Sequence, residues 1–198
     1  MKTRNTVSAL ALGLSLALAI GTPPAFAQMS SGMGSMGPEQ TVMVGGAAMY
    51  PSRNIVQNAI HSKDHTTLVA AVKAAGLVKT LEGPGPFTVF APTNGAFDAL
   101  PAGTVQTLLK PENKAQLTKI LTYHVVPGRL DTKTLDAKIA AGGGEAKLKT
   151  VEGDWLTVKG SGTRLTVTDD KGNTADITIP NVYQSNGVIM VINKVLMP

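Results

Sequence analysis

Tyr123 and His124 stand side by side near the middle of the chain and are the residues best suited to chemistry. An imidazole changes its charge near neutral pH, so it can serve as an acid, a base or a metal ligand. The surrounding segment ILTYHVVPGRL, residues 120–130, places the pair between an apolar helix-like run and a Val-Val-Pro-Gly break. Two interpretations follow: the pair marks a functional site, or it is a polar anchor inside the core.

Two further histidines have the spacing of a metal pair. His61 and His65 lie four residues apart, as two ligands on one helix would. Residues 62–64, however, resemble a turn between two helices, and no third ligand lies nearby in the sequence. We therefore interpret both as solvated surface histidines.

Residues 28–49, QMSSGMGSMGPEQTVMVGGAAM, are rich in Gly, Ser and Met. This composition predicts a flexible segment. Thioether ligands select Cu(I), so Met29, Met33 and Met36 could form a weak soft-metal site, and Cu(I) handling in the envelope is an alternative function. The favoured interpretation is a spacer in which methionine is incidental. No other metal site and no cofactor is predicted.

The common catalytic motifs do not occur in the sequence. It has no G-x-S-x-G or H-E-x-x-H motif and no cysteine. Its glycine-rich stretches at 142–145 and 160–162 lack the lysine and the spacing of a phosphate-binding loop. Asp169 and Asp170 fall in a predicted turn, where a solvated pair is expected. We therefore predict no catalytic residue and no enzymatic activity.

The first 27 residues have the three parts of a secretory signal peptide. A basic start, MKTR, precedes an apolar run at 7–20, and Ala25 and Ala27 occupy the positions that a signal peptidase recognises. The apolar run is too short to span a bilayer comfortably. We expect residues 1–27 to be removed and the protein to be secreted into the periplasm or the extracellular space. No stable membrane insertion is expected after cleavage, and without cysteine the stability must come from burial.

The charge of the chain does not favour nucleic acid as a partner. The sequence has 18 basic and 13 acidic residues, and loss of Lys2 and Arg4 with the leader lowers the basic count to 16. The charges are scattered, without a basic stripe or a set of stacking aromatic residues. The composition, 43% hydrophobic and 16% charged over 198 residues, is typical of a globular protein with one domain.

The elements that must position these residues change character along the chain. From residue 51 to 141 apolar residues recur at helical spacing, interrupted by a short strand at 87–90. After the glycines at 142–144 the period becomes two, and Asn186-Gly187 is a strong hairpin signal. Helices first and strands later predict an α+β fold.

A second motif, FTVFAPTNGAF at residues 87–97, joins the early strand to a helix. Its turn contains Thr and Asn, whose side chains can cap the first turn of a helix. We interpret the motif as structural. Its members are Phe90, Pro92, Thr93, Asn94 and Phe97.

The segments FTVFAPTNGAF, ILTYHVVPGRL and NGVIMVINKVLMP resemble, in order and spacing, the two characteristic blocks and the closing strand of fasciclin-like domains. GGAAMYPSRNI also resembles the start of small bacterial secreted fasciclin-like proteins. The resemblance implies one fasciclin-like domain over residues 50–198, a β-sandwich or wedge flanked by several short helices. The closing strand departs from the family pattern at Met190 and Asn193, where a histidine and an acidic residue are usual.

The resemblance also implies an adhesion function, and we expect a monomer that binds a protein or glycan of the cell surface or matrix. In animal relatives the tyrosine-histidine block has been proposed to bind integrins. Carried over, it falls on Tyr123 and His124 beside Leu121, Val125 and Val126. These apolar neighbours predict burial, with the phenol and the imidazole bonded to backbone at a helix-to-strand junction. We therefore favour a structural role over a binding role.

Overall fold

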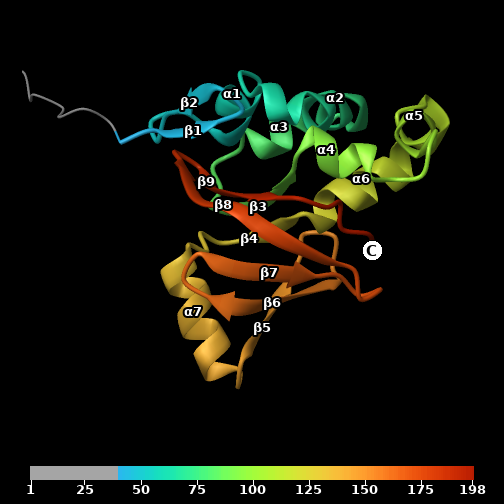
Figure 1. Ribbon diagram of the computed structural model, residues 1–198. Coiled ribbons are helices and arrows are strands. Elements are labelled where there is room, and N and C mark those ends of the chain that lie inside the picture. The colour runs from blue at the N-terminus through green and yellow to red at the C-terminus, as the bar shows by residue number, and fades with distance from the viewer. Residues whose placement is uncertain (1–39) are drawn as a thin grey trace, which may run out of the picture. The chain divides into compact units, whose positions relative to one another are not determined.

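The computed structural model describes residues 40–198, which mix helices and strands as an α+β fold (Figure 1). The strands are β1 (Val42–Val44), β2 (Ala47–Met49), β3 (Phe87–Pro92), β4 (Val125–Pro127), β5 (Glu145–Lys149), β6 (Trp155–Ser161), β7 (Arg164–Thr168), β8 (Thr174–Gln184) and β9 (Gly187–Ile192). The helices are α1 (Ile55–Ala59), α2 (Thr66–Ala75), α3 (Val78–Leu81), α4 (Asn94–Asp98), α5 (Thr104–Leu108), α6 (Lys114–Tyr123) and α7 (Thr132–Ala141), with 3-10 turns η1 (Lys63–His65) and η2 (Pro111–Asn113).

The larger sheet of the described chain is a wedge that nearly closes on itself. Its strand order is β4-β3-β9-β8-β7-β6-β5, and β3 pairs with β9 in parallel while the other neighbours are antiparallel. The two edges meet where the Val151 N–H, just after β5, donates to the Val125 carbonyl in β4 at 2.8 Å. The last strand, β9, lies inside the sheet between β3 and β8.

Two hydrophobic cores lie on opposite faces of β3 and β9. Val188, Met190 and Ile192 of β9 belong to the core inside the wedge, whereas Ile189 and Val191 belong to the core under the helices. All six residues of β9 are buried, as expected for a strand that is apolar on both of its faces.

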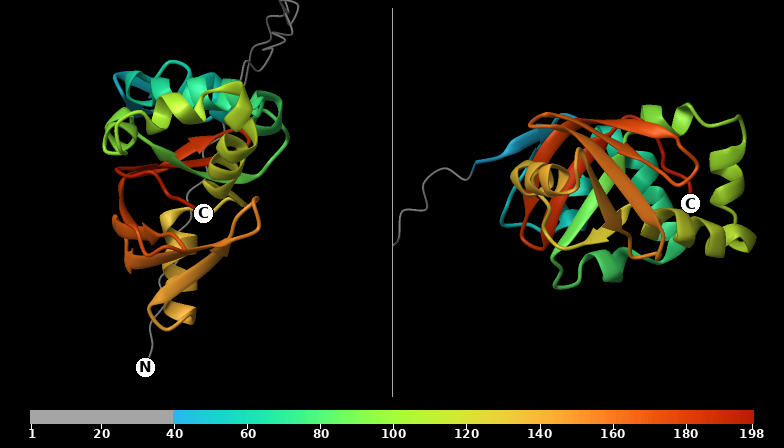
Figure 2. Two further views of the ribbon diagram at one scale, coloured as in Figure 1. Left: turned by 90° about the vertical axis from the view of Figure 1, so that its right-hand side faces the viewer. Right: turned by 90° about the horizontal axis from the view of Figure 1, so that it is seen from below.

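The helices divide between these two cores. The β1–β2 hairpin and helices α1 to α5 gather on one side of β3 and β9, and α7 lies beside β5 to β7, away from that layer (Figures 1 and 2). Leu135 and Ile139 of α7 reach the core inside the wedge. A wedge flanked by short helices, as the resemblance implied, is therefore the observed architecture.

Side-chain caps begin α4 and α7, and the cap of α4 uses the threonine that the sequence indicates. The Thr93 hydroxyl accepts the Ala96 N–H at 3.3 Å to start α4, and the Asp131 carboxylate accepts the Thr134 N–H at 2.8 Å to start α7. Asn94 has a different role from the one predicted, because it caps another helix. The Asn94 side chain makes two hydrogen bonds that join α4 to the start of α2. Its Oδ1 accepts the Thr67 N–H at 3.1 Å, and its Nδ2 donates to the Lys63 carbonyl at 2.8 Å.

The prediction that residues 28–49 form a flexible segment is wrong for residues 42–49. These residues form the β1–β2 hairpin, and Val44 and Met49 are buried in the core under the helices. The turn uses Gly45 and Gly46, both at positive φ, and a side chain at Gly45 would collide with the Ser62 hydroxyl. The folded domain therefore begins before residue 50.

The predicted hairpin near the C-terminus joins β8 to β9, but its turn is Ser185 and Asn186, one residue earlier than the Asn186-Gly187 pair that the sequence indicates. Asn186 is buried, and its side chain connects the turn to the helical layer. Its Oδ1 accepts the Ile55 N–H at 3.0 Å, and its Nδ2 donates to the Leu81 carbonyl at 2.7 Å. Gly187 starts β9 so close to Phe87 that a side chain would collide with the Phe87 carbonyl. The hairpin signal thus also fixes where α1 and α3 sit.

Between residues 40 and 198, every helix is too short or too polar to cross a lipid bilayer.

The hairpin contribution to stability can be measured with two methionines on opposite faces of it. Met49→Ala should lower the free energy of unfolding by about 2–5 kcal/mol, because Met49 is buried and its truncation leaves a cavity. Met43→Ala is the control, since Met43 is 59% exposed and its truncation should change stability by less than about 0.5 kcal/mol. Urea denaturation of both variants tests this, and equal stabilities would show that the hairpin is not part of the cooperative core.

Candidate functional site

Tyr123 and His124 lie where α6 passes into β4. Tyr123 ends the helix, His124 is its C-cap, and Val125 begins the strand. The two sides of this junction face different cores: Leu121 and Val125 pack under the helices, and Tyr123 and Val126 pack inside the wedge. All five residues are buried, so the pair sits at the boundary between the two cores.

The hydroxyl of Tyr123 connects three segments of the chain. It donates to the Trp155 carbonyl at the start of β6 at 2.9 Å, and it accepts the Asp170 N–H at 3.0 Å. Burial raises the pKa of Tyr123 to about 12, with smaller contributions from nearby carboxylates. The phenol therefore keeps its proton and serves as both donor and acceptor.

His124 uses both ring nitrogens in hydrogen bonds to backbone. Nδ1 lies 2.8 Å from the Ile120 carbonyl, and Nε2 accepts the Leu196 N–H at 3.0 Å. A carbonyl can only accept and an amide N–H can only donate, so the ring is neutral with its proton on Nδ1. Burial lowers the pKa of His124 to about 4, partly offset by the Ile120 bond and by Asp169.

Asp169 completes the arrangement, and the prediction that it is a solvated residue is wrong. It is buried, and its carboxylate accepts the N–H groups of Lys171 at 3.0 Å and Asn173 at 2.8 Å. It also accepts the Met197 N–H at 3.0 Å. Asp169 and His124 together therefore hold the C-terminal segment; Asp170 is exposed. An aspartate ahead of a Gly-Asn turn is typical of such side-chain-to-backbone bonding, which is the signal that the sequence offered.

The structure brings one member of the other predicted motif to this junction. The Phe90 N–H donates to the His124 carbonyl at 2.9 Å, and Phe90 and Tyr123 share the core inside the wedge. Thr93, Asn94 and Phe97 lie at the far end of β3, where they start α4 and contact α2. Pro92, the last residue of β3, is buried. The two sequence blocks thus meet at Phe90 and His124.

Of the residues considered as metal ligands, the structure describes only the histidines. His65 is buried, so its prediction as a surface residue is wrong, and His61 is exposed as predicted. Within residues 40–198 there is no group of three His, Asp or Glu side chains that could hold a metal ion. The methionine set Met29, Met33 and Met36 and the leader 1–27 lie outside the described residues.

The two departures from the family pattern both make local contacts. Met190 is buried inside the wedge, and the Asn181 N–H lies 3.4 Å from its sulfur. Asn193 pairs with Asp176: its Oδ1 accepts the Asp176 N–H and its Nδ2 donates to the carboxylate, both at 2.8 Å. The neutral amide thus makes a donor and an acceptor contact with a single partner.

Next to the buried junction, the surface carries two exposed apolar side chains. Val151 and Trp155 flank the turn between β5 and β6 and are 45% and 48% exposed. Their backbones are tied to the junction, since the Val151 N–H bonds to Val125 and the Trp155 carbonyl bonds to Tyr123. Lys119 of α6 reaches across to Glu152 in this turn at 3.4 Å. The junction therefore holds this part of the surface in place.

Comparison with known families identifies the origin of this arrangement. The sequence model of the fasciclin domain matches residues 63–198, which include the tyrosine-histidine junction and the closing strand. The chain belongs to the fasciclin domain family.

Two bacterial relatives cover most of this fasciclin domain protein. Protein sll1483 of Synechocystis sp. is 46% identical over 160 residues, which cover 81% of this chain and 82% of the relative. The immunogenic protein MPB70 of Mycobacterium bovis is 36% identical over 211 aligned positions, covering 100% of this chain and 99% of the relative.

A solved structure has the same fold. It is a domain pair from the insect cell adhesion molecule fasciclin I, with a TM-score of 0.65 and 18% identity. The match covers 75% of this chain and 52% of that chain. Residues 40–198 thus form a single domain of the fasciclin fold.

The Tyr123 hydroxyl can be tested by removing only its oxygen. Tyr123→Phe leaves the Asp170 N–H and the Trp155 carbonyl without this partner, which should lower the free energy of unfolding by about 1–3 kcal/mol. Tyr183→Phe is the matched control, because that hydroxyl is exposed and lies 3.3 Å from Asp131, and the loss should stay below about 0.5 kcal/mol. Urea unfolding that ranks the two variants equally would refute the anchoring role.

The pH dependence of stability should depend on His124. Its pKa is about 4 in the folded fasciclin domain against an ordinary value of 6.5, so the unfolded chain binds more protons between these values. The free energy of unfolding should therefore fall as the pH drops from 6.5 to 4, by about 3 kcal/mol from this residue. The lowered pKa of His65 acts in the same direction.

Urea unfolding at several pH values checks this for wild type and His124→Gln. The variant should lose stability less steeply between pH 6.5 and 4 than wild type. His61→Gln, at an exposed position, is the control and should keep the wild-type dependence. An unchanged slope in His124→Gln would show that His124 does not titrate in this window.

Proposed function

We propose that this fasciclin domain is a secreted, monomeric interaction domain that binds a protein or glycan at the cell surface or in the envelope. We further propose that the contact surface is the turn between β5 and β6, with Val151 and Trp155 as its exposed apolar residues. The leader-like residues 1–27 support secretion. The fold shared with a cell adhesion molecule supports an interaction function rather than an enzymatic one.

The exposure of Trp155 is the observation that carries the proposal. Tryptophan is among the residues that contribute most to binding energy at protein interfaces. Its indole also presents a large apolar face together with an N–H donor, which suits a protein surface or a sugar ring. On β6, Leu156 and Val158 alternate inward, so Trp155 faces outward in the regular pattern of the strand. Solvent exposure of this side chain therefore leaves it available to a partner.

The backbone of the turn is held rigidly, which favours binding because little freedom is lost when a partner arrives. The Thr150 N–H donates to the Asp154 carbonyl at 2.9 Å and closes the turn. The bonds to Val125 and Tyr123 fasten its two ends to the buried junction. The surface contacts of Lys119 with the turn contribute little to stability but add a charged rim.

Tyr123 and His124 support this surface from below and do not contact the partner in our proposal. They are buried together with Leu121, Val125 and Val126, and contact with a partner would require opening of both cores. Their hydrogen-bonding groups are already paired with backbone. A structural role of the pair is thus favoured over the direct binding proposed for animal relatives.

The test separates the exposed tryptophan from the buried pair. Trp155→Ala should lower affinity for the partner by about tenfold or more, as expected for an interface tryptophan, while stability changes by less than about 0.5 kcal/mol. Met43→Ala removes an exposed apolar side chain from the β1–β2 hairpin and is the control, with unchanged affinity. Affinity is measured against arrayed glycans and against proteins of the envelope and matrix, by surface plasmon resonance.

Stability-corrected binding of His124→Gln completes the test. Per folded molecule, this variant should bind like wild type, because His124 is buried beneath the surface. Loss of binding in folded His124→Gln together with full binding by Trp155→Ala would show that the buried pair, and not the turn, is the adhesive site.

A further inference from the structure

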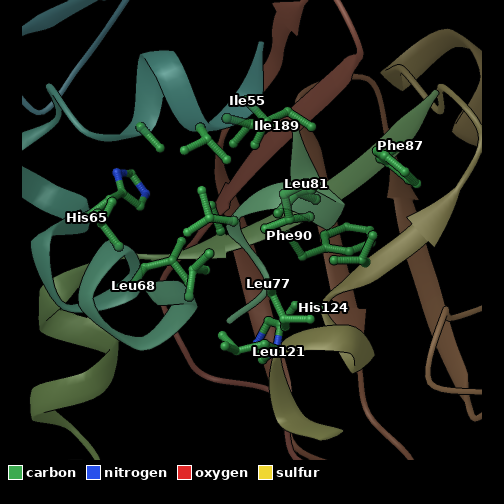
Figure 3. A pocket seen from close by; sticks show the side chains of 18 of the residues that line it. Ile55, His65, Leu68, Leu77, Leu81, Phe87, Phe90, Leu121, His124 and Ile189 are labelled. Atoms are coloured by element: carbon green, nitrogen blue, oxygen red, sulfur yellow. The ribbon is translucent and has the colours of Figure 1, made fainter. Parts of the chain in front are cut away.

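An apolar cavity of about 80 Å³ lies between the helical layer and the sheet. Its walls come from α1, α2, α3 and α6 on one side and from β3 and β9 on the other. Figure 3 shows the side chains around it, among them Ile55, Leu68, Leu77, Leu81, Phe87 and Ile189. The cavity and the proposed contact surface share Val151, whereas Trp155 does not line the cavity.

One polar side chain within this wall lacks a complete set of partners. His65 also lines the cavity and is 3% exposed (Figure 3). Its Nδ1 lies 2.9 Å from the Ser62 hydroxyl, whereas Nε2 has no hydrogen-bond partner among residues 40–198. Buried polar atoms are nearly always paired, so this nitrogen requires an explanation.

The contact with Ser62 indicates which ring nitrogen carries the proton. The Ser62 hydroxyl is buried, and among the described residues its hydrogen-bond partner is His65. The Ser62 hydroxyl therefore donates its proton to Nδ1. If Nδ1–H donated to the hydroxyl oxygen instead, the hydroxyl proton would have no acceptor. The neutral ring then has its proton on Nε2. The unpaired atom is thus a donor, and it calls for an acceptor.

The charge of the His65 ring indicates which kind of acceptor fits. Burial lowers the pKa of His65, and two groups offset part of this effect: Asp64, and a backbone contact with Ala91 that is too long or too bent to be a hydrogen bond. The imidazole is consequently neutral near pH 7 and offers a hydrogen bond without a positive charge. Of the lining residues only the exposed Lys73 is cationic. An uncharged oxygen therefore fits this wall better than a carboxylate, which would lose its hydration without gaining a counter-charge.

We propose that this cavity binds a small neutral carbonyl compound with an alkyl chain, a ketone, aldehyde or ester, whose oxygen accepts the Nε2–H of His65. The apolar walls take the alkyl part, and the single donor orients the carbonyl. A water molecule fits less well, because a buried water needs two to four polar partners and the walls offer few beside Nε2.

The size of the cavity limits the part of the ligand that it encloses. Its 80 Å³ is about half the volume of an engineered cavity that holds benzene, so it accepts a group of about five heavy atoms. Lys73, Thr80 and Val151 line the cavity and are exposed, so it reaches the surface. A longer alkyl chain can therefore leave the cavity at this opening.

The experiment uses 2-butanone as the probe, titrated into isotope-labelled protein and followed by NMR. We expect saturable binding with a Kd of about millimolar, as the small number of atoms allows. The shifts should concentrate on the His65 ring and on the methyl groups of Ile55 and Leu68. Absence of saturable shifts at these residues in the wild-type protein would overturn the proposal.

Two variants separate the hydrogen bond from the cavity. His65→Phe combined with Ser62→Ala removes the donor without leaving a new unpaired hydroxyl, and should weaken 2-butanone binding about tenfold. Xenon, which has no acceptor, should bind wild type and this variant alike. Equal 2-butanone affinity of the two proteins would exclude the imidazole as the anchor.

The second variant, Ala59→Leu, keeps His65 and fills part of the cavity from α1. It should reduce the binding of both probes. Unchanged 2-butanone binding in folded Ala59→Leu would place the ligand elsewhere and also overturn the proposal, even if the double variant fails to fold. Binding to glycans or proteins through Trp155 is unaffected by either result, so the two proposals are tested separately.

Discussion

The structure depends on hydrogen bonds to two buried side chains, the phenol of Tyr123 and the imidazole of His124. Both lie where α6 passes into β4, between two hydrophobic cores. A buried polar group without a partner costs about 1–3 kcal/mol, a large part of the stability of an ordinary domain. Here each group has backbone partners far away in sequence. Tyr123 bonds to β6 and to the loop after β7, and His124 bonds to the C-terminal segment.

This requirement explains why segments that are distant in sequence converge on the junction. The parallel pairing of β3 with β9 brings the end of the chain beside Phe90, whose N–H bonds to the His124 carbonyl. Asp169 then binds the Met197 N–H, so the residues after β9 are held although they form no strand. The wedge closes because Val125, directly after His124, accepts the N–H of Val151. One short segment thus fixes the sheet edge, the C-terminus and the turn that carries Trp155.

Local sequence signals predicted those elements whose stability is local. The cap at Thr93 and the hairpin between β8 and β9 follow from residue type and period, and the structure contains them. The hairpin at 42–49 was missed because its strands have three residues each and sit in a Gly-rich and Met-rich stretch. The burial of Val44 and Met49 against distant helices stabilises it, and the two glycines between apolar residues are the hairpin signal that its sequence contains.

The burial of Asp169 and His65 could not be predicted for the same reason, although the turn-type hydrogen bonds of Asp169 have a local sequence signal. Asp169 is buried because the C-terminal segment covers it, and His65 is buried because the α1, α2 and β3 residues around it enclose it. The C-terminal segment is distant in sequence from Asp169, and β3 is distant from His65. Charged and polar residue types favour the surface on average, so a prediction from residue type alone places both in solvent.

The two buried histidines show how partner count separates a structural role from a binding role. In His124 both ring nitrogens bond to backbone, so the ring has no hydrogen-bonding group left for a ligand. Burial also lowers its pKa and so disfavours the protonated ring. In His65 one nitrogen is paired with Ser62 and the other is unpaired at the wall of an apolar cavity. Both rings are almost equally buried, so burial alone does not distinguish them. The unpaired donor does, because a ligand that supplies the acceptor removes an energetic cost that the fold otherwise retains.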